Sequence, residues 1–514
     1  MGGRHEDQRT ASCLASEVTV IGSGMAPPAT DDRSPDAVVV GSGPNGLSAG
    51  VVLARAGWSV LMVEARATIG GGSRTGELTL PGFRHDICSA VHPLAAGSPF
   101  LRSLPLERQG LEWIHPDVPL AHPLDDGRVA VLRRSLDETA ESLGADARSY
   151  HALMGPVAQS GEALLPHLRS PAGIARNAGP LARHPVALAR FTLASLGSVA
   201  RLARARFEDS PARALLAGMG GHSNLPLTWS PTAGFALGLA LGGHVVGWPV
   251  AAGGSQAIAD ALASIFIELG GEIQTETTVT SLDDLPPARA IVLDLTPRQV
   301  LQVAGSRLPL RYQRAFQRYR YGPGVFKMDW ALDSPIPWRD EVCRAAGTLH
   351  LGGTLEEIAA GEAAVWQGNH PERPFLILSQ PSLFDRSRAP DGKHTAWAYC
   401  HVPNGSSVDM AGRVEAQIER FAPGFRDCIL ARNIMRTGDV ARYNQNYIGG
   451  DMAGGVQDLE QAFVRPSLVS SPYWVAGDHI YFCSSATPPG PGVHGMCGYL
   501  AARAVLAREG RRRK

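Results

Sequence analysis

The feature that most constrains this chain is a run of glycines between a short apolar strand and a helix. Residues 36–40, Asp-Ala-Val-Val-Val, predict a buried parallel strand. The sequence Gly41-Ser-Gly43-Pro-Asn-Gly46 follows, and residues 47–56 have helical character. A second strand is predicted over residues 58–63, and Glu64 ends it. This order is typical of a βαβ unit that binds a dinucleotide.

Each part of this motif has a physical reason. Gly41 permits the tight turn after the strand, Gly43 lets the backbone approach a pyrophosphate, and Gly46 lets the helix pack closely on the strand. Glu64 comes 23 residues after Gly41, where a carboxylate accepts hydrogen bonds from both hydroxyls of an adenosine ribose. Because an acid at this position disfavours a 2′-phosphate, NADP is not expected here.

An earlier match to the motif, at residues 18–24, is rejected. It has two glycines, but no third glycine follows, and Pro27 and Pro28 prevent a helix. Residues 1–35 are polar and irregular, so we expect a disordered leader or a mis-set start site.

Two further glycine-bearing segments bear on the identity of the nucleotide, and the first of them resembles the segment that large two-domain flavoproteins place along the pyrophosphate and towards the flavin. Residues 64–66 lead into Gly70-Gly-Gly-Ser-Arg74, an extension that simple NAD dehydrogenases do not usually carry. Near the C-terminus, Gly477-Asp478 and the Pro/Gly-rich residues 488–496 precede a helix predicted over residues 495–508. The N-terminus of that helix would stabilise negative charge on a reduced flavin.

The predicted fold class is α/β, with a discontinuous Rossmann-like FAD-binding domain and an inserted α+β substrate domain. Residues 116–234 are rich in Ala, Leu and Arg and predict helices, and a strand is predicted over residues 277–282. Further strands are predicted at residues 272–274, 290–293, 324–332, 375–380, 394–401 and 481–484, with a helix at 414–421. The predicted divisions are a leader (1–35), three FAD-binding segments (36–115, 235–300 and 456–514), a helical substrate or lid segment (116–234) and a substrate domain (301–455).

Composition narrows the function classes. Lys plus Arg and Asp plus Glu both number 48, so the formal net charge is zero and nucleic acid is not expected as the main partner. The seven cysteines include no CxxC, so we expect no metal site, no disulfide framework and a reducing, cytoplasmic compartment. No secretory signal is predicted.

Two stretches bear on the substrate and on membrane contact. Residues 214–259 contain no Asp, Glu, Lys or Arg, but their prolines and glycines argue against a membrane span. They predict the wall of a hydrophobic substrate cavity or, equally, plain core.

Residues 164–207 carry seven arginines and no acid, which is typical of a solvated helical surface or of a basic face on anionic lipid. The second alternative would make the protein peripherally membrane-associated.

Taken together, these residues resemble the phytoene desaturase and amine oxidase-like superfamily of FAD enzymes. Within it, the resemblance is greatest to the family of pyridine nucleotide-disulfide oxidoreductase domain-containing protein 2. It covers essentially everything after residue 36, and its most specific phrases are residues 82–89, 321–327, 401–405, 446–451 and 483–498. It implies a FAD-binding domain of the glutathione reductase and amine oxidase type. Disulfide reduction is not expected, because no CxxC or CxxxxC pair is present.

The resemblance implies FAD-binding roles residue by residue. The glycine loop would hold the pyrophosphate, Glu64 the ribose, and Arg66 would lie near the same phosphates, while Val279 would offer backbone groups to adenine from a strand. Arg74 departs from the family pattern because Gly72 and Ser73 precede it, so its role is left open. The predicted FAD-binding residues are Gly41, Ser42, Gly43, Pro44, Asn45, Gly46, Glu64, Ala65, Arg66, Gly71, Gly72, Ser73, Arg74, Val279, Gly477, Asp478, Val493, His494, Gly495 and Met496.

No obligatory nucleophile is visible, because a flavin itself carries the hydride chemistry. Histidine suits proton transfer near neutral pH, and His494, whose loop should touch the flavin, is the first candidate, followed by His92. Lys327 is a third candidate, because some amine oxidases hold a water against the flavin with a lysine.

The predicted activity is that of a FAD-dependent oxidoreductase. It transfers a hydride between a carbon of an apolar or part-apolar small molecule and flavin N5, as phytoene desaturase-like dehydrogenases do. The alternatives are an amine oxidase-type flavoenzyme and a weakly active flavin-binding regulatory protein.

Overall fold

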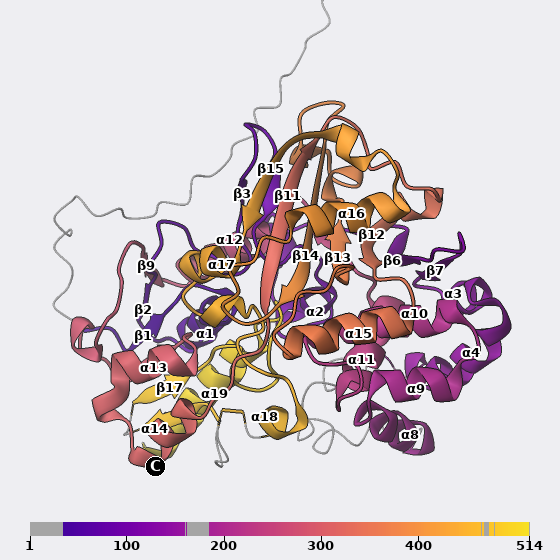
Figure 1. The fold of residues 1–514 in the computed structure, drawn as a ribbon. Coiled ribbons are helices and arrows are strands. Elements are labelled where there is room, and N and C mark those ends of the chain that lie inside the picture. The colour runs from indigo at the N-terminus through magenta and orange to yellow at the C-terminus, as the bar shows by residue number, and fades with distance from the viewer. Residues whose placement is uncertain are drawn as a thin grey trace, which may run out of the picture.

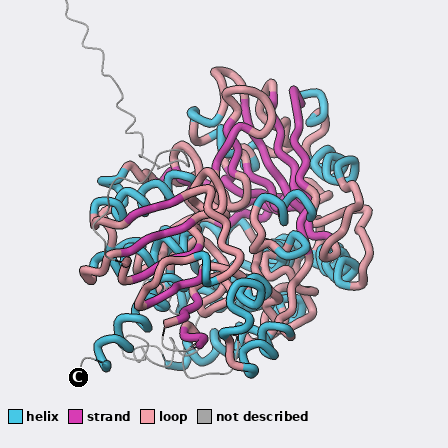
Figure 2. The backbone as a smooth tube through the Cα atoms, turned by 90° about the vertical axis from the view of Figure 1, so that its left-hand side faces the viewer, coloured by secondary structure: helices cyan, strands magenta, loops and turns pink. Residues whose placement is uncertain are grey.

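The computed structural model describes residues 34–159, 161, 185–463, 465–466, 472–476 and 479–512. Two separate sheets organise these residues, and helices surround both (Figures 1 and 2). The strand order of the first sheet is β16 (Trp474–Ala476), β17 (Ile480–Phe482), β10 (Ala290–Leu293), β1 (Ala37–Val40), β2 (Val60–Val63) and β9 (Glu272–Gln274). That of the second is β15 (Ile429–Met435), β11 (Gly324–Leu332), β14 (His394–Val402), β13 (Leu376–Ser379), β12 (Ala346–Leu351), β6 (Val118–Pro123) and β7 (Val129–Leu132).

The first sheet draws its strands from three distant stretches of the chain. All of its pairings are parallel except β16 with β17. The side chains of β1 point alternately to the two faces of this sheet. Ala37 and Val39 pack in the core on one face, and Val38 and Val40 pack in the core on the other. The first core includes α1 (Pro44–Arg55), α12 (Gln256–Glu268) and α19 (Met496–Arg512), and the second includes α13 (Pro297–Ala304) and α14 (Leu310–Gln317). The sheet is therefore covered by helices on both faces, as a parallel sheet requires.

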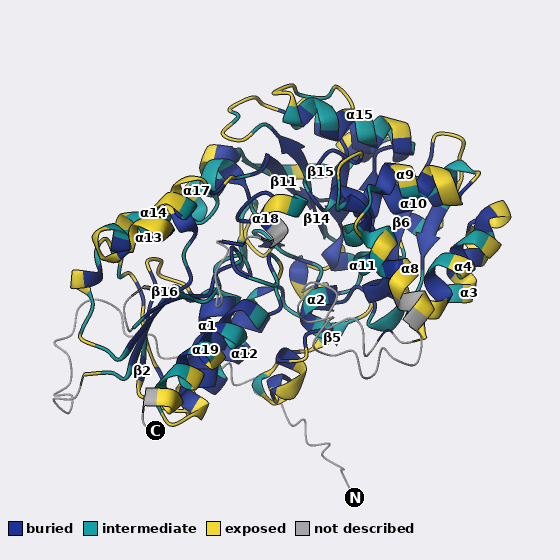
Figure 3. Ribbon diagram, turned by 90° about the horizontal axis from the view of Figure 1, so that it is seen from below, coloured by how far each residue is buried: buried dark blue, intermediate teal, exposed yellow. Residues whose placement is uncertain are grey.

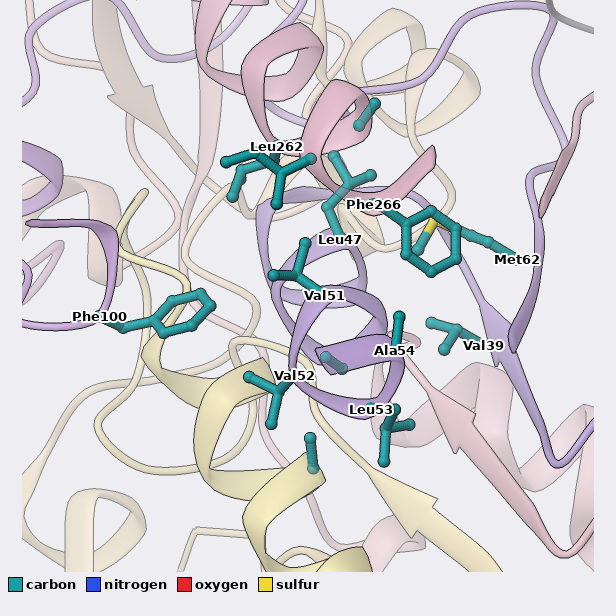
Figure 4. Close-up of a cluster of buried hydrophobic side chains, with 14 of the residues drawn as sticks. Val39, Leu47, Val51, Val52, Leu53, Ala54, Met62, Phe100, Leu262 and Phe266 are labelled. Atoms are coloured by element: carbon teal, nitrogen blue, oxygen red, sulfur yellow. The ribbon is translucent and has the colours of Figure 1, made fainter. Parts of the chain in front are cut away.

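Helix α1 is the centre of the first core (Figure 4). Its apolar side chains, among them Leu47 and Val51, meet Phe266 of α12 and Met62 of β2. The helix packs very closely here, since a Cβ added to Gly50 would lie 2.9 Å from the Met62 methyl carbon. Burying a side chain the size of Phe266 stabilises the fold by about 1.5–3 kcal/mol. This packing fixes the N-terminus of α1 relative to the sheet.

The second sheet is mixed and has different coverings on its two faces. Helix α16 (Ala411–Phe421) packs on one face, where Phe326, Met328 and Trp330 of β11 are buried. The helices α10 (Ser210–Gly221), α11 (Thr232–Val245) and α15 (Leu355–Trp366) pack on the other. The outer helices show exposed faces at the rim, whereas the strands are buried (Figure 3). The remaining helices are α2 (Pro93–Ala96), α3 (Leu136–Ser142), α4 (Ala147–Ala158), α8 (Pro185–Ser195), α9 (Val199–Arg206), α17 (Thr437–Tyr443) and α18 (Leu459–Phe463), and two small sheets pair β3 (Thr75–Glu77) with β4 (Arg84–Asp86) and β5 (Trp113–Ile114) with β8 (Val250–Ala251).

Two expectations about secondary structure are wrong. The segment 116–234 is not helical from its start, because β6 and β7 form its first part and join the second sheet. Residues 277–280 are an extended loop and not a strand, and a short 3₁₀ turn, Leu282–Asp284, follows. The uncharged stretch 214–259 contributes α10 and α11 to a buried core. Among the described helices, none has the length and apolarity needed to cross a membrane.

Candidate functional site

A cavity of about 570 Å³ lies at the carboxyl ends of β1, β2, β10 and β17. Ligands of open α/β sheets bind at this edge, and the volume is in the usual range for small-molecule sites. The predicted FAD-binding residues that line it are Gly41, Gly43, Pro44, Asn45, Glu64, Ala65, Arg66, Gly71, Gly72, Ser73, Arg74, Val279 and Val493. Three segments far apart in sequence therefore meet at one cavity.

Other predicted residues lie behind the wall or outside the described residues. Ser42 is fully buried, and both its backbone N–H and its hydroxyl donate to Glu64 Oε2, at 3.0 and 2.6 Å. Gly46 packs on the strand so tightly that a Cβ would lie 1.9 Å from the Gly41 carbonyl oxygen. Met496 is the first residue of α19 and Gly495 precedes it, and neither lines the cavity. Gly477 and Asp478 lie outside the described residues.

The glycine loop presents a helix N-terminus to the cavity. Gly43 is the N-cap of α1 and offers no side chain, and Pro44 occupies the first turn. Gly71 comes so close to this loop that a Cβ would lie 2.9 Å from the Gly43 Cα, and its φ of +55° also favours glycine. The two glycine segments thus form a close-fitting cradle at the positive end of a helix dipole.

Glu64 lines the cavity but is already well bonded. Besides the two bonds from Ser42, its Oε1 accepts from the Arg66 backbone N–H at 3.0 Å and from Arg74 at 3.2 Å. Its side chain is only 10% exposed. A ribose hydroxyl would therefore share this carboxylate with the Ser42 hydroxyl or with Arg74, because a carboxylate offers about four lone-pair positions.

Arg74, whose role the sequence left open, holds the second glycine segment in place. Its guanidinium donates to the carbonyl oxygens of Thr68 and Ile69 and pairs with Glu64. The ring of Tyr443 lies 5.5 Å from the guanidinium carbon. Arg74 thus ties the loop, the ribose-side carboxylate and an aromatic side chain from another segment together.

Asp294, directly after β10, is a wall residue that the sequence did not single out. Its Oδ2 accepts a hydrogen bond of 3.0 Å from the Gly46 backbone N–H in the first turn of α1. Burial raises the pKa of Asp294 to about 7, and the charge of Glu64 adds a smaller rise. The hydrogen bond from Gly46 lowers this pKa and offsets part of the effect. A buried carboxyl with this pKa is partly neutral at physiological pH.

A strap, defined here as residues 443–447, also lines the cavity, although it comes from the region predicted as substrate domain. The Tyr443 hydroxyl donates to the Gly71 carbonyl oxygen at 2.7 Å. The Asn446 amide donates to the Asp294 carbonyl oxygen at 3.1 Å and accepts from the Thr296 N–H at 2.8 Å. The strap therefore spans the cavity from the glycine segments to the end of β10. No local motif signals this, since its partners are distant in sequence.

Two of the three catalytic candidates are histidines that lie away from the cavity and contact the start of a helix. The Nε2 atom of His494 lies 3.1 Å from the Gly490 carbonyl oxygen, and its Nδ1 accepts from the Met496 N–H, so this imidazole braces the start of α19. The Nε2 atom of His92 is 2.9 Å from the Ser255 hydroxyl at the start of α12, and neither histidine lines the cavity. Burial lowers the pKa of His92 to about 4, which keeps it neutral.

Lys327, the third candidate, acts electrostatically on Cys88, a side chain of the cavity wall. It is 1% exposed on β11, and its ammonium pairs with Asp329 and lies 5.7 Å from the centre of the Trp397 ring. Burial raises the pKa of the Cys88 thiol, and the charge of Lys327 opposes that rise. Cys88 lines the cavity, beside Tyr447 and Met452. Lys327 thus belongs to the second sheet, and its charge acts on a side chain of the cavity wall.

The residues at the cavity fit a dinucleotide with a flavin. Asn45 Oδ1 and Ser73 Oγ are buried at the wall without a hydrogen-bond partner, which is costly unless a ligand or water satisfies them. The glycine cradle leaves room for phosphate groups that no Cβ obstructs, and Glu64 lies beside it. Among the described residues, no group of His, Cys, Asp and Glu could hold a metal, and the cysteines are free.

Comparisons with known proteins agree with this fold. Residues 39–102 match the family model of the NAD(P)-binding Rossmann-like domain. The chain is 27% identical to pyridine nucleotide-disulfide oxidoreductase domain-containing protein 2 of Mus musculus, over 92% of this chain and 93% of the relative. It is 24% identical to a neurosporene-forming phytoene desaturase of Rhodobacter capsulatus, over 48% of this chain and 51% of the desaturase. A solved putrescine oxidase variant matches 93% of this chain and 99% of its own length, with a TM-score of 0.58 and 17% identity.

These matches confirm the predicted resemblance and the predicted fold class. The chain is homologous to pyridine nucleotide-disulfide oxidoreductase domain-containing protein 2 and, over about half of its length, to phytoene desaturase; it shares its fold with a solved putrescine oxidase, and it is an oxidoreductase. The individual FAD-binding residues and the catalytic candidates stay predictions.

Proposed function

We propose that this chain binds FAD in the cavity at the end of the first sheet and uses it to oxidise or reduce a carbon centre of an apolar or part-apolar small molecule. The observation that carries the proposal is the meeting of three glycine-bearing segments at one cavity, with Asn45 Oδ1 and Ser73 Oγ left unpaired at its wall. The position fits the rule for ligands of open parallel sheets.

Backbone and side-chain groups from several segments of the chain would bind the FAD. The N-terminus of α1 favours the charge of the pyrophosphate, and the glycines let the backbone come close. Glu64 and the Val279 loop would hold the adenosine half, and the strap would lie along the nucleotide. When bound, FAD would supply a carrier for a hydride, that is, for one proton and two electrons.

Lys327 is our candidate for handling the proton that accompanies the hydride. Its charge lowers the pKa of the Cys88 thiol at the cavity wall, opposing the effect of burial, and Asp329 pairs with its ammonium. If Lys327 acts in this way, Lys327→Met slows flavin reduction and changes its pH profile, while FAD content stays that of the native protein.

A second candidate function is amine oxidation. It is supported by the amine oxidase fold and by the parallel aromatic pair Trp397 and Tyr399, whose ring centres are 5.8 Å apart. Anaerobic mixing of the FAD-loaded protein with amines, with polyenes and with NAD(P)H separates the two functions. Loss of flavin absorbance with amines alone supports this second function and contradicts a desaturase-like dehydrogenase.

The FAD site is tested through Glu64. Glu64→Ala removes the carboxylate, and we expect FAD affinity to fall about 10- to 100-fold, because a hydrogen bond to a charged group contributes about 1.5–3 kcal/mol. FAD content after dialysis measures this, with the exposed Glu77→Ala as a matched control. Equal FAD content in both variants, or a native protein that stays colourless after incubation with FAD, contradicts the proposal.

A further inference from the structure

Helix α8 turns an apolar face outward. Val186 is 63% exposed and Leu193 is 72% exposed, and Ala189 and Leu196 are exposed as well. These four positions follow one another at intervals of three and four residues, which places them on one face of a helix. Phe191, on the opposite face, is buried in the core that includes α11. A surface helix normally turns its apolar face to the core, so the outward face of α8 suits contact with a second apolar phase.

The apolar surface continues to Trp229, which is 43% exposed. The Thr232 hydroxyl donates to the Trp229 carbonyl oxygen at 2.6 Å and accepts from the Val199 N–H at 2.9 Å. The Ala233 N–H donates to the Gly197 carbonyl oxygen at 3.2 Å. The turn that carries Trp229 is therefore fixed against the end of α8. We call this surface the α8 patch, and it comprises Val186, Ala189, Leu193, Leu196 and Trp229.

The charged residues around α8 in the sequence are all basic. Residues 185–207, the described part of the arginine-rich stretch 164–207, contain no Asp or Glu. Arg190 is exposed on the same face of α8, four residues after Val186. The exposed arginines of α9 are Arg201, Arg204 and Arg206. Because acidic and basic residues balance over the whole chain, this positive charge is a local property.

Helices α8 and α9 lie at the same edge of the molecule (Figures 1 and 3). Both pack against α11. The acid that meets this basic surface comes from another helix, since Arg204 pairs with Glu356 of α15 at 3.5 Å. The edge thus combines an apolar helix face with exposed arginines from two helices.

An anionic lipid surface fits this combination better than a second copy of the chain. Two copies joined through the α8 patch would bring the arginines of both together, and residues 185–207 offer no acid to pair with them. At a lipid surface, apolar side chains enter the boundary of the acyl chains, while arginine side chains extend to the phosphate groups. Tryptophan is typical of that boundary.

We propose that the α8 patch binds the surface of an anionic lipid bilayer, with Leu193 and Trp229 at the boundary of the acyl chains and Arg190 at the phosphate groups. The inference goes beyond the proposed function and holds with or without FAD. Contact of this kind would bring the enzyme to the phase in which an apolar small molecule dissolves.

Vesicle flotation of the full chain tests the proposal. The vesicles contain phosphatidylcholine alone, or phosphatidylcholine and phosphatidylglycerol in equal parts. We expect binding to the anionic vesicles to be at least about tenfold tighter, because each arginine near an anionic surface contributes about fivefold. The preference should fall when the salt concentration rises from about 0.1 M to about 1 M, since the Debye length shortens from about 10 Å to about 3 Å.

Substitutions at exposed positions locate the contact. Leu193→Ser should weaken binding to anionic vesicles about tenfold, or about 1.4 kcal/mol, because a leucine side chain no longer enters the apolar phase. Arg190→Gln should weaken binding to anionic vesicles about fivefold and leave binding to neutral vesicles unchanged. The matched controls on α14 are Leu310→Ser, at a leucine that is 67% exposed, and Arg318→Gln, at an exposed arginine, and both should bind like the native protein. Melting temperatures verify that the variants are folded.

Several outcomes would overturn the inference. They are no binding to anionic vesicles, equal binding to both kinds of vesicle, and equal losses in Leu193→Ser and Leu310→Ser. A native dimer that becomes monomeric in Leu193→Ser, measured by sedimentation equilibrium, would mean that the patch joins two copies and would also overturn it. The assay is read with and without FAD, so failure of FAD uptake contradicts the proposed function and leaves the vesicle result independent.

Discussion

Asp294→Asn is the most informative single substitution at the cofactor cavity. Asp294 is buried after β10, and its Oδ2 accepts the 3.0 Å hydrogen bond from the Gly46 N–H. Asparagine has the same shape, and its amide oxygen can accept the same bond. The substitution therefore removes one ionisable group and keeps the contact with α1.

The magnitude follows from the pKa. The carboxyl has a pKa of about 7 in the folded protein, against 3.8 for an unperturbed aspartate. At about 1.4 kcal/mol per pKa unit, this difference costs the native protein up to about 4 kcal/mol of stability. Because the folded-state pKa is raised, the cost is absent below about pH 4, grows as the pH rises toward 7, and is constant above that.

Urea unfolding of the cofactor-free protein between pH 4 and pH 9 measures this cost. The free energy of unfolding of Asp294→Asn should rise relative to that of the native protein across pH 4 to 7, by up to about 4 kcal/mol, and then stay parallel. Asp391→Asn, at an exposed aspartate, is the control and should show no such rise. A stability difference between Asp294→Asn and the native protein that does not change with pH refutes the reasoning, because it would mean that Asp294 is ionised throughout.

Three further substitutions test separate parts of the fold and the site. Gly71→Ala should abolish FAD retention on gel filtration, because the new Cβ would lie 2.9 Å from the Gly43 Cα and φ is +55°. Asn446→Ala should speed FAD release about tenfold in a fluorescence assay, because it cuts the strap from Asp294 and Thr296. Phe266→Ala should lower the free energy of urea unfolding by about 3–5 kcal/mol, since this ring is fully buried against α1. Unchanged FAD retention, unchanged release or a loss below 1 kcal/mol would count against the respective argument.

The first βαβ unit could be predicted from sequence because all of its determinants are local. The β-branched strand, the spacing of Gly41, Gly43 and Gly46, and the acid at Glu64 lie within about thirty residues, and each follows from backbone sterics or charge. Strands β6 and β7 were missed for a related reason. Every residue of β6 is buried and two of them are prolines, so the alternation that normally marks a strand is absent.

The strap and Asp294 could not be predicted, because their roles depend on contacts across the fold. Asn446 is 152 residues from Asp294 in sequence, and nothing in its neighbourhood indicates that the two will meet. The surroundings of the histidine candidates could not be predicted either. His494 stands in the loop before α19, as expected, and both of its ring nitrogens contact the backbone around it, which the sequence did not indicate.

The contrast between local sequence patterns and contacts across the fold also applies to the expected substrate cavity. The uncharged stretch 214–259 predicted the wall of an apolar cavity or, equally, plain core, and its helices α10 and α11 are buried. The side chains opposite them belong to alternate positions of separate strands, and each strand alone shows only one or two polar residues, such as His122 or His350. Strand pairing brings these residues into one row, and only then do their unpaired nitrogens lie together on one face. A row of polar side chains assembled in this way has no sequence signature, because hydrophobicity is read along the chain whereas the row runs across the strands.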